Sequence, residues 1–288
     1  MQSLISDQPT MARYCIHLAY NGLNYCGWQT QPHDPSVQQT LEDALSLLLR
    51  HKVSLVGCGR TDTGVHAADF YAHFDLPNDF DASISSMHGA GRNLQPATFV
   101  NQLAFKLNSF LPEDIRVYNI CRVTDNFHAR FDALSRTYQY HVSDKRLPFR
   151  QGLYNRIYFH PDVDLMNQGA QALMDYEDFT SFAKLHTQVK TNICHLYQAH
   201  WDWEGEELVF TIQANRFLRN MVRAVTGTLL DVGRGSLTVA GLRDIVEKKN
   251  RCAAGTSMPA QGLFLVRVEY PASSFAYKNN EISDNQLS

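Results

Sequence analysis

The first half of the chain alternates between strand-like and helix-like patterns of hydrophobic residues. Apolar side chains occupy every second position over 14–20, which predicts a strand with one buried face. Over 37–48 they recur every three or four positions behind Ser36, which predicts a capped amphipathic helix. Short apolar runs near 53–58 and 68–75 predict two further strands.

The second half mixes the two kinds of element in the same way. Strands are predicted near 115–123, 135–143 and 263–270, with a hairpin at 193–213 and helices near 97–109, 163–175, 216–232 and 237–249. Because strands and a hairpin are interspersed with helices, the pattern favours an α+β fold over a doubly wound parallel sheet.

Length and composition limit the class of protein. At 288 residues with 44% hydrophobic content, the chain is large enough for one or two domains with substantial cores. No apolar run approaches the roughly 18 residues of a transmembrane helix, and the first ten residues lack the pattern of a signal peptide. Six scattered cysteines without a C-x-x-C pair predict reduced thiols, not disulfides or a zinc site. We therefore expect a cytoplasmic protein that does not enter a membrane.

Charge is distributed unevenly along the chain, although the formal net charge is only −3. Residues 215–251 carry eight cations against three acids, and residues 128–156 carry six against two. This segregation permits one basic face on a mildly acidic protein, which suits a nucleic-acid ligand. The alternative is that the cations lie on ordinary solvated faces, and charge alone does not decide between the two.

Residues 57–67 form the most informative chemical pattern. The string Gly-Cys-Gly-Arg-Thr-Asp-Thr-Gly-Val-His-Ala follows a predicted strand, and its three glycines permit a sharp turn close to a ligand. Its one carboxylate, Asp62, lies two positions from the guanidinium of Arg60, which suits a carboxylate that stays ionised. Such a group can act as a nucleophile or stabilise a developing cation. The alternative is a tight turn in which Asp62 only bonds nearby backbone N–H groups.

The complete string resembles the GxGRTDxGVHA signature of the TruA family of tRNA pseudouridine synthases, whose essential aspartate corresponds to Asp62. Four other stretches are similar to motifs of this family, in the same order. They are 20–32 (YDGxxFxGWQxQ, with Asn21 in place of aspartate), 127–140 (FHARxxAxxRxYxY), 214–227 (AxxFLxxMVRxxxG) and 253–265 (AGxTAPAxGLxL, from which Ser257 and Met258 depart). The resemblance covers nearly the whole chain, apart from a longer link at 80–100 that we expect to include a surface loop at 83–93.

The resemblance implies a site built around one carboxylate. Asp62 would attack either the base or the sugar C1′, with Arg60 and Arg223 holding it ionised and oriented. Tyr138, the first tyrosine of the 127–140 motif, would pack against a flipped pyrimidine. We assign substrate binding to Tyr138, Thr61, Arg216 and Arg219, the two arginines as phosphate contacts.

The resemblance also implies a reaction and its setting. The family converts uridine to pseudouridine in the anticodon stem-loop of tRNA, at positions 38 to 40, without a cofactor or a metal. Its members have two similar α/β domains with mixed, mainly antiparallel sheets, related by a pseudo-twofold axis, with the active cleft between them. We place the domains at 11–125 and 126–271, with disordered ends at 1–10 and 272–288. A homodimer that binds tRNA across both subunits is expected, with no other protein partner evident.

Two other functions remain open from the sequence. A non-catalytic tRNA-binding module could use the same scaffold, although the presence of Asp62 argues against it. A glycosidase needs two carboxylates across the scissile bond, and the 57–67 string holds one.

Overall fold

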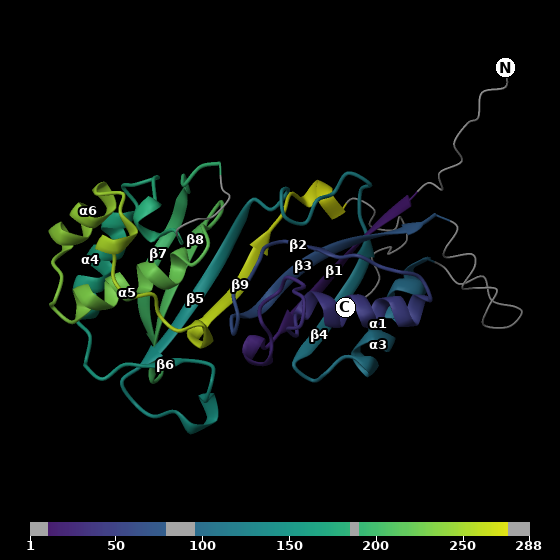
Figure 1. Cartoon of the computed structure of the whole chain (residues 1–288), viewed down its shortest axis with the longest axis horizontal. Helices are drawn as coiled ribbons and strands as arrows, with labels where there is room; N and C mark the ends of the chain where they lie inside the picture. The colour runs from purple at the N-terminus through teal and green to yellow at the C-terminus, as the bar shows by residue number, and fades with distance from the viewer. Residues whose placement is uncertain (1–10, 79–95, 185–189, 276–288) are drawn as a thin grey trace, which may run out of the picture.

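The computed structural model describes residues 11–78, 96–184 and 190–275, which form an α+β structure (Figure 1). Within these residues nine strands make one sheet, in which seven follow the order β4-β1-β3-β9-β5-β8-β7, while β2 pairs with β3 and β6 with β5. All the pairs are antiparallel except β3 with β9 and β5 with β6. The predicted fold class is therefore confirmed as α+β with a mixed, mainly antiparallel sheet.

The elements follow the predicted order. The strands are β1 (Met11–Tyr20), β2 (Val56–Gly57), β3 (His66–Pro77), β4 (Ile115–Arg122), β5 (Ser135–Ser143), β6 (Asn155–Arg156), β7 (Leu196–Glu204), β8 (Glu207–Ala214) and β9 (Leu263–Glu269). The helices are α1 (Val37–Leu49), α3 (Pro96–Phe110), α4 (Val163–Leu173), α5 (Met221–Gly233) and α6 (Val239–Glu247). Figure 1 shows α1 and α3 near one end of the sheet and α4, α5 and α6 near the other.

The local signals in the sequence explain where the first elements form. Ser36 is the N-cap of α1, and its hydroxyl accepts a hydrogen bond from the N–H of Gln39 (3.1 Å). Leu41 and Leu45 on this helix are fully buried, as the apolar stripe predicts. In β1 the alternate residues Ile16 and Leu18 are also fully buried. Amphipathic patterning therefore fixes which face of each element meets the core.

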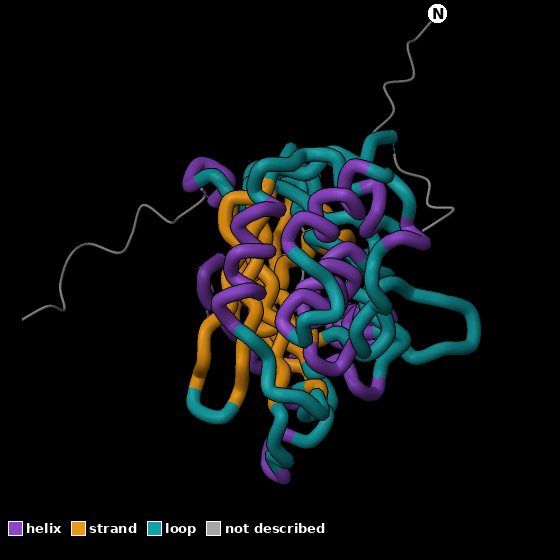
Figure 2. Tube along the Cα trace, turned by 90° about the vertical axis from the view of Figure 1, so that its left-hand side faces the viewer, coloured by secondary structure: helices purple, strands orange, loops and turns teal. Residues whose placement is uncertain are grey.

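Two hydrophobic cores meet on one face of the sheet. The first lies under α1 and α3 and the second under α4, α5 and α6, which Figure 2 shows packed against the strands at that end. Cross-strand neighbours link the two: Tyr20 pairs with Ala67, Ala67 with Leu265, Leu265 with Tyr138, and Tyr138 with Ile212. Directly paired residues share a face, so this row runs across the sheet. Tyr138 packs against both cores and marks the seam between them.

The helix predicted near 216–232 begins later than expected. In the structure α5 starts at Met221, and its N-cap Asn220 has a left-handed backbone conformation (φ 66°). The chain therefore turns sharply just before the helix, because Asn is one of the few residues that adopt this conformation readily. As a consequence, Arg216 and Arg219 lie on a loop and do not continue the helical stripe of Arg223.

The predicted end of the second domain also differs from the structure. Residues Ala272–Phe275, assigned to the disordered tail, form a short 3-10 helix. The Phe275 ring packs near Tyr71, Phe127 and Tyr270, and this aromatic contact holds the segment on the body. The predictions for the N-terminus at 1–10, the surface loop at 83–93 and the end of the tail lie outside the described residues.

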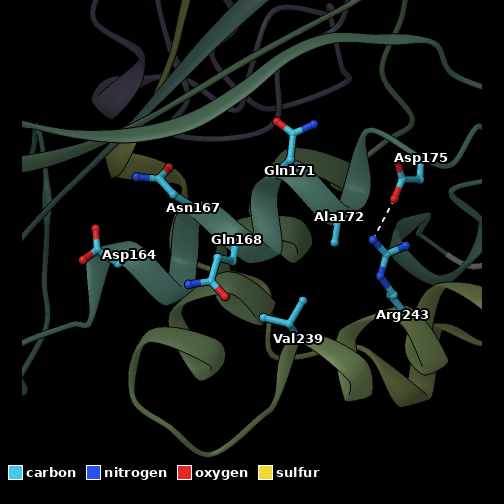
Figure 3. A pocket seen from close by; sticks show the side chains of 8 residues that line it. All are labelled: Asp164, Asn167, Gln168, Gln171, Ala172, Asp175, Val239 and Arg243. Carbon is cyan, nitrogen blue, oxygen red and sulfur yellow. Dashed lines mark hydrogen bonds and ion pairs between the residues drawn. The ribbon is translucent and has the colours of Figure 1, made fainter.

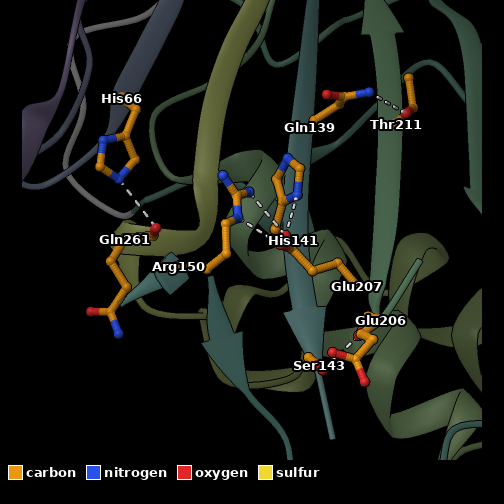
Figure 4. A network of polar contacts seen from close by, with 9 residues as sticks. All are labelled: His66, Gln139, His141, Ser143, Arg150, Glu206, Glu207, Thr211 and Gln261. Carbon is orange, nitrogen blue, oxygen red and sulfur yellow. Dashed lines mark hydrogen bonds and ion pairs between the residues drawn. The ribbon is translucent and has the colours of Figure 1, made fainter. Parts of the chain in front are cut away.

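A network of polar contacts joins β5, β8 and the loop after β5 (Figure 4). Glu207 is its centre: it forms a bidentate ion pair with Arg150 (2.6 and 3.0 Å) and a hydrogen bond with His141 (2.8 Å). Burial acts to raise the pKa of Glu207, but the hydrogen bonds and charge of Arg150 outweigh it and lower the pKa. The network thus fixes the 144–154 loop by a bidentate pair, the stronger geometry for such contacts.

Candidate active site

The loop between β2 and β3 presents Asp62 and is braced from behind. Its Cys58 N–H donates to the Tyr71 carbonyl (2.7 Å), and the hydroxyls of Thr61 and Tyr20 hydrogen bond inside the core (2.9 Å). The N–H of Val65 donates to the Asp62 carbonyl (3.1 Å) and closes the turn. Asp62 is thus held by its backbone, so its carboxylate is free for other partners.

The 20–32 stretch supplies the second brace, and glycine is required there. Gly27 has φ +89°, and a Cβ at this position would lie 2.3 Å from the Thr61 carbonyl oxygen. Trp28 beside it is buried, and the backbone N–H of Trp28 donates to the same Thr61 carbonyl (3.3 Å). This stretch therefore supports the Asp62 loop by close backbone contact, and its tryptophan is not available for stacking on a ligand.

Two arginines from the C-terminal half of the chain meet the Asp62 carboxylate. The Nε of Arg219 lies 3.4 Å from Oδ1, and Nη1 of Arg223 lies 3.6 Å from Oδ2. The side chain of Asp62 is 25% exposed, that of Arg223 21% and that of Arg219 60%. We call these three residues the Asp62 cluster. The carboxylate of Asp62 thus lies between two guanidiniums and stays partly open to solvent.

Arg223 is fixed more firmly than Arg219. Its Nε donates to the carbonyl of Met258 (2.6 Å), and its own carbonyl accepts from the N–H of Met258 (3.1 Å). Gly227 allows this approach, because a Cβ there would lie 1.9 Å from the carbonyl oxygen of Thr256. The 253–265 motif therefore positions Arg223.

Tyr138 lies at the seam between the two cores. Its ring meets Phe217 edge to face, with centroids 5.2 Å apart and planes at 89°. Burial raises the pKa of Tyr138, and the negative charge of Asp62 acts in the same direction. The hydroxyl therefore stays protonated close to the Asp62 carboxylate and can donate a hydrogen bond.

Two predicted site residues are placed differently from expectation. Thr61 is only 8% exposed and its hydroxyl points into the core, so the structure gives it a supporting role and not a substrate contact. Arg60 is exposed, and no ion pair joins it to Asp62 in the part of the chain that the structure describes. Arg219 occupies the place beside the carboxylate that we predicted for Arg60.

Arg136 is a site residue that we did not assign from the sequence. Its guanidinium donates to four backbone carbonyls: Nη2 to Cys58 (2.9 Å) and Arg130 (2.6 Å), Nη1 to Ala133 (3.2 Å) and Asn215 (3.1 Å). These acceptors come from three separate parts of the chain. The sequence did signal Arg136, as the second arginine of the 127–140 motif and on the strand face of Tyr138, but neither signal identifies its partners.

Two hollows of the described surface lie away from the Asp62 cluster. One of about 640 Å³ lies between α4 and α6 and is lined by Asn167, Gln168 and Gln171 together with the Asp175–Arg243 ion pair (Figure 3). A second, of about 250 Å³, lies near His66, Glu113 and Arg116. Within the described residues no group of three or more His, Cys, Asp or Glu side chains is arranged to hold a metal ion. Nor is any helix in those ranges long and apolar enough to span a membrane.

His73 on β3 gives the protein a pH-dependent stability. Its buried ring accepts a hydrogen bond at Nδ1 from the N–H of Ala129 (3.1 Å), and burial, followed by the charges of Arg13 and His128, lowers its pKa to about 4. Since the folded pKa lies below the unfolded value of 6.5, the unfolded chain binds more protons between these values. The contribution of His73 to the free energy of unfolding is therefore complete above about pH 6.5 and is lost as the pH falls towards 4.

Urea denaturation of the wild type and His73→Asn at two pH values tests this contribution. The Asn amide oxygen can accept the same hydrogen bond but does not titrate. Between neutral pH and about pH 5, we expect the wild type to lose about 2 kcal/mol more unfolding free energy than the variant. Equal losses in both proteins would contradict the assignment.

The chain is similar to proteins of known name over most of its length. The sequence pattern of the tRNA pseudouridine synthase family matches residues 170–271. The tRNA pseudouridine synthase A of Parabacteroides distasonis is 51% identical over 265 residues, which cover 92% of this chain and 98% of the relative. The protein of the same name from Bacteroides thetaiotaomicron is 51% identical over 269 residues, 92% of this chain and 93% of the relative. That from Porphyromonas gingivalis is 48% identical over 267 residues, 92% of this chain and all of the relative.

Proposed function

The chain belongs to the tRNA pseudouridine synthase A family, and from this premise we propose that it isomerises uridine to pseudouridine in tRNA with Asp62 as the nucleophile. We propose the anticodon stem-loop, positions 38 to 40, as the place of modification. The observation that carries the proposal is the partly exposed Asp62 carboxylate, which lies between the guanidiniums of Arg219 and Arg223 and near Tyr138.

The chemistry requires one bond to break and one to form. The bond from uracil N1 to C1′ of the ribose breaks, the base turns, and C5 bonds to C1′. C5 then loses its proton and N1 gains one, so the atoms balance without any co-reactant. A carboxylate such as Asp62 can attack C1′ or the base and leave again in the second half of the reaction.

We assign distinct parts to the residues around Asp62. Arg223, anchored on Met258, keeps the carboxylate oriented and ionised throughout the reaction. Arg219 is more exposed, and we propose that it both pairs with Asp62 and meets the substrate. Tyr138 offers a ring face to the base and a protonated hydroxyl close to the carboxylate. We propose that Arg216 contacts phosphate, and that no cofactor or metal takes part.

The two hydrophobic cores support a division into domains at 11–125 and 126–271. Each core has its own helices, and we propose that the target base enters a cleft along the seam between them. A pseudo-twofold relation between the domains and a cytoplasmic location are part of the same proposal. We also propose a homodimer that binds one tRNA across both subunits, which light scattering of the purified protein would test.

Nucleoside analysis of tRNA tests the proposed reaction directly. Unmodified tRNA transcript labelled in uridine is incubated with the protein and digested to nucleosides. Pseudouridine supports the proposal. Unchanged uridine would favour a non-catalytic binding module, and free uracil would favour a glycosidase.

Tyr138→Phe is expected to retain more activity than Tyr138→Leu. The ring provides stacking surface in both the wild type and the Phe variant, and loss of a stacking ring lowers kcat/KM by roughly 10- to 100-fold. Tyr158→Leu, an exposed tyrosine, is the matched control. If the Phe variant were as inactive as the Leu variant, the hydroxyl and not the ring would be the essential part.

A further inference from the structure

Three guanidiniums gather beside the Asp62 loop without acidic partners. In the described parts of the chain, Arg60, Arg130 and Arg216 form no ion pair with any carboxylate. Burial lowers the pKa of Arg130, and the positive charges of Arg60, Arg136 and Arg216 lower it further, which places these groups within electrostatic reach of one another. Like charges repel, so such a cluster destabilises the free protein unless an anion binds there.

The guanidinium of Arg136 holds together the three chain segments that carry these arginines. The four carbonyls that Arg136 binds include those of Cys58, two residues before Arg60, and Asn215, immediately before Arg216. A third belongs to Arg130 itself. Arg136 therefore ties three chain segments to one point, and each segment carries one of the unpaired guanidiniums. The fold therefore sets the backbone positions from which the three guanidiniums extend.

The turn that carries Arg130 also presents an aromatic ring to solvent. Phe131 is 75% exposed, and its ring lies against that of His128, with centroids 4.2 Å apart. His128 Nδ1 accepts from the N–H groups of Arg130 (3.2 Å) and Phe131 (3.3 Å), and Asp132 accepts from the N–H of His128 (2.8 Å). The turn is therefore rigid. A fixed, exposed ring beside unpaired cations matches the chemistry of a nucleotide, which has a flat base and a charged phosphate.

We propose that the turn at 128–132 binds a nucleotide next to the target uridine, with Arg60, Arg130 and Arg216 on its phosphate and Phe131 stacked on its base. The inference rests on the proposed function, because it assumes that the ligand is RNA. Arg60 is two residues from Asp62, a span of at most about 7 Å along the backbone, so a phosphate on Arg60 would belong to the target uridine or to a nucleotide near it. None of Arg130, Phe131 and Arg136 had been assigned to the substrate from the sequence.

Binding measurements in the Asp62→Asn protein test the phosphate contact without turnover. The probe is an anticodon-arm stem-loop RNA, and affinity is measured by fluorescence anisotropy over a series of salt concentrations. Arg130→Ala should weaken binding about tenfold and reduce the salt slope by about one unit. Arg130→Lys should keep the slope. Arg243→Ala, an exposed arginine on α6 that pairs with Asp175, is the matched control and should change neither.

Modified RNA identifies the contact itself. Stem-loops that carry one neutral methylphosphonate on either side of the target uridine are compared in a double-mutant cycle with Arg130→Ala. One of the two methylphosphonate RNAs should bind the protein that retains Arg130 more weakly than the unmodified stem-loop does. The Arg130→Ala variant should bind that RNA and the unmodified stem-loop equally well. An abasic neighbouring nucleotide should likewise cost affinity with Phe131 and none with Phe131→Leu. If modification of the RNA lowered the affinity equally in the protein that has the side chain and in the variant that lacks it, the two groups would act independently. That result would overturn the proposed site.

Failure of this inference and failure of the proposed function have different signatures. If the wild type forms pseudouridine but the cycles show no coupling, only the nucleotide site is wrong. If the wild type forms no pseudouridine, the proposed reaction fails, whatever the cycles give. Phe131 is exposed, so Phe131→Leu should leave the thermal midpoint unchanged, and a lowered midpoint would assign the ring to stability and contradict its role in binding.

Discussion

Asp62→Asn is expected to lose turnover by about a thousandfold or more, while its fold and its affinity for tRNA remain close to those of the wild type. The amide has nearly the same shape as the carboxylate and can stay between Arg219 and Arg223. It is neutral, however, and can neither attack C1′ or the base nor stabilise a developing cation. Tritium release from tRNA labelled at C5 of uridine measures the rate, because C5 loses its proton in the reaction.

Two further variants make the Asp62 result specific. Asp62→Glu should also lower the rate of turnover by about a hundredfold, because the longer side chain displaces the carboxylate by roughly 1 Å. Asp43→Asn changes an exposed aspartate on α1 in the same chemical way and should leave the rate unchanged. If Asp62→Asn kept even a tenth of the wild-type rate, Asp62 would not be the nucleophile.

Arg223→Gln is expected to have the second-largest effect, a loss of roughly a hundredfold in kcat. Arg223 is partly buried and anchored on Met258, so the carboxylate of Asp62 would lose its fixed partner and not merely a mobile surface charge. Arg219→Gln should cost less than about tenfold in kcat, because exposed ion pairs are weak. Its main effect should be on KM, since the exposed guanidinium is free to meet phosphate.

The split between kcat and KM decides whether the two arginines differ in kind. Single-turnover rates and binding constants of Arg219→Gln and Arg223→Gln separate chemistry from affinity. We expect Arg223→Gln to bind the stem-loop almost normally but to react slowly. If both variants showed the same salt-dependent loss of binding and no separate rate defect, Arg223 would be an ordinary phosphate contact.

The sequence predicted the elements well where one local pattern decided them. The alternation in β1 and the apolar stripe of α1 identified both elements and their buried faces, because burial on one side imposes these periods directly. The ordered motifs led to Asp62, Arg223 and Tyr138, which the fold brings to one place. The mixed sheet followed from the order of strands and helices.

Some predictions about the site were wrong or missing because they depend on three-dimensional geometry, which the periodicity of apolar residues does not reveal. The apolar pattern continues through 216–220, but the left-handed Asn220 stops the helix there and turns Arg219 towards Asp62. Arg60 lies two positions from Asp62 in the sequence and was therefore assigned to it, but among the described residues Arg219 and Arg223 form the ion pairs with Asp62. Arg136 acts through the carbonyls of Cys58 and Asn215, far away along the chain, and no local signal encodes such contacts.

Mapping of pseudouridine at single-nucleotide resolution shows where the protein acts and whether Asp62 is required. An unmodified tRNA transcript with uridines at positions 38 to 40 and elsewhere is incubated with the wild type or with Asp62→Asn, and modified positions are read by carbodiimide adduct formation and primer extension. We expect pseudouridine within positions 38 to 40 for the wild type and none for Asp62→Asn. If Asp62→Asn formed pseudouridine as fast as the wild type, Asp62 would not be the nucleophile, and pseudouridine only outside the anticodon stem-loop would rule out the proposed target.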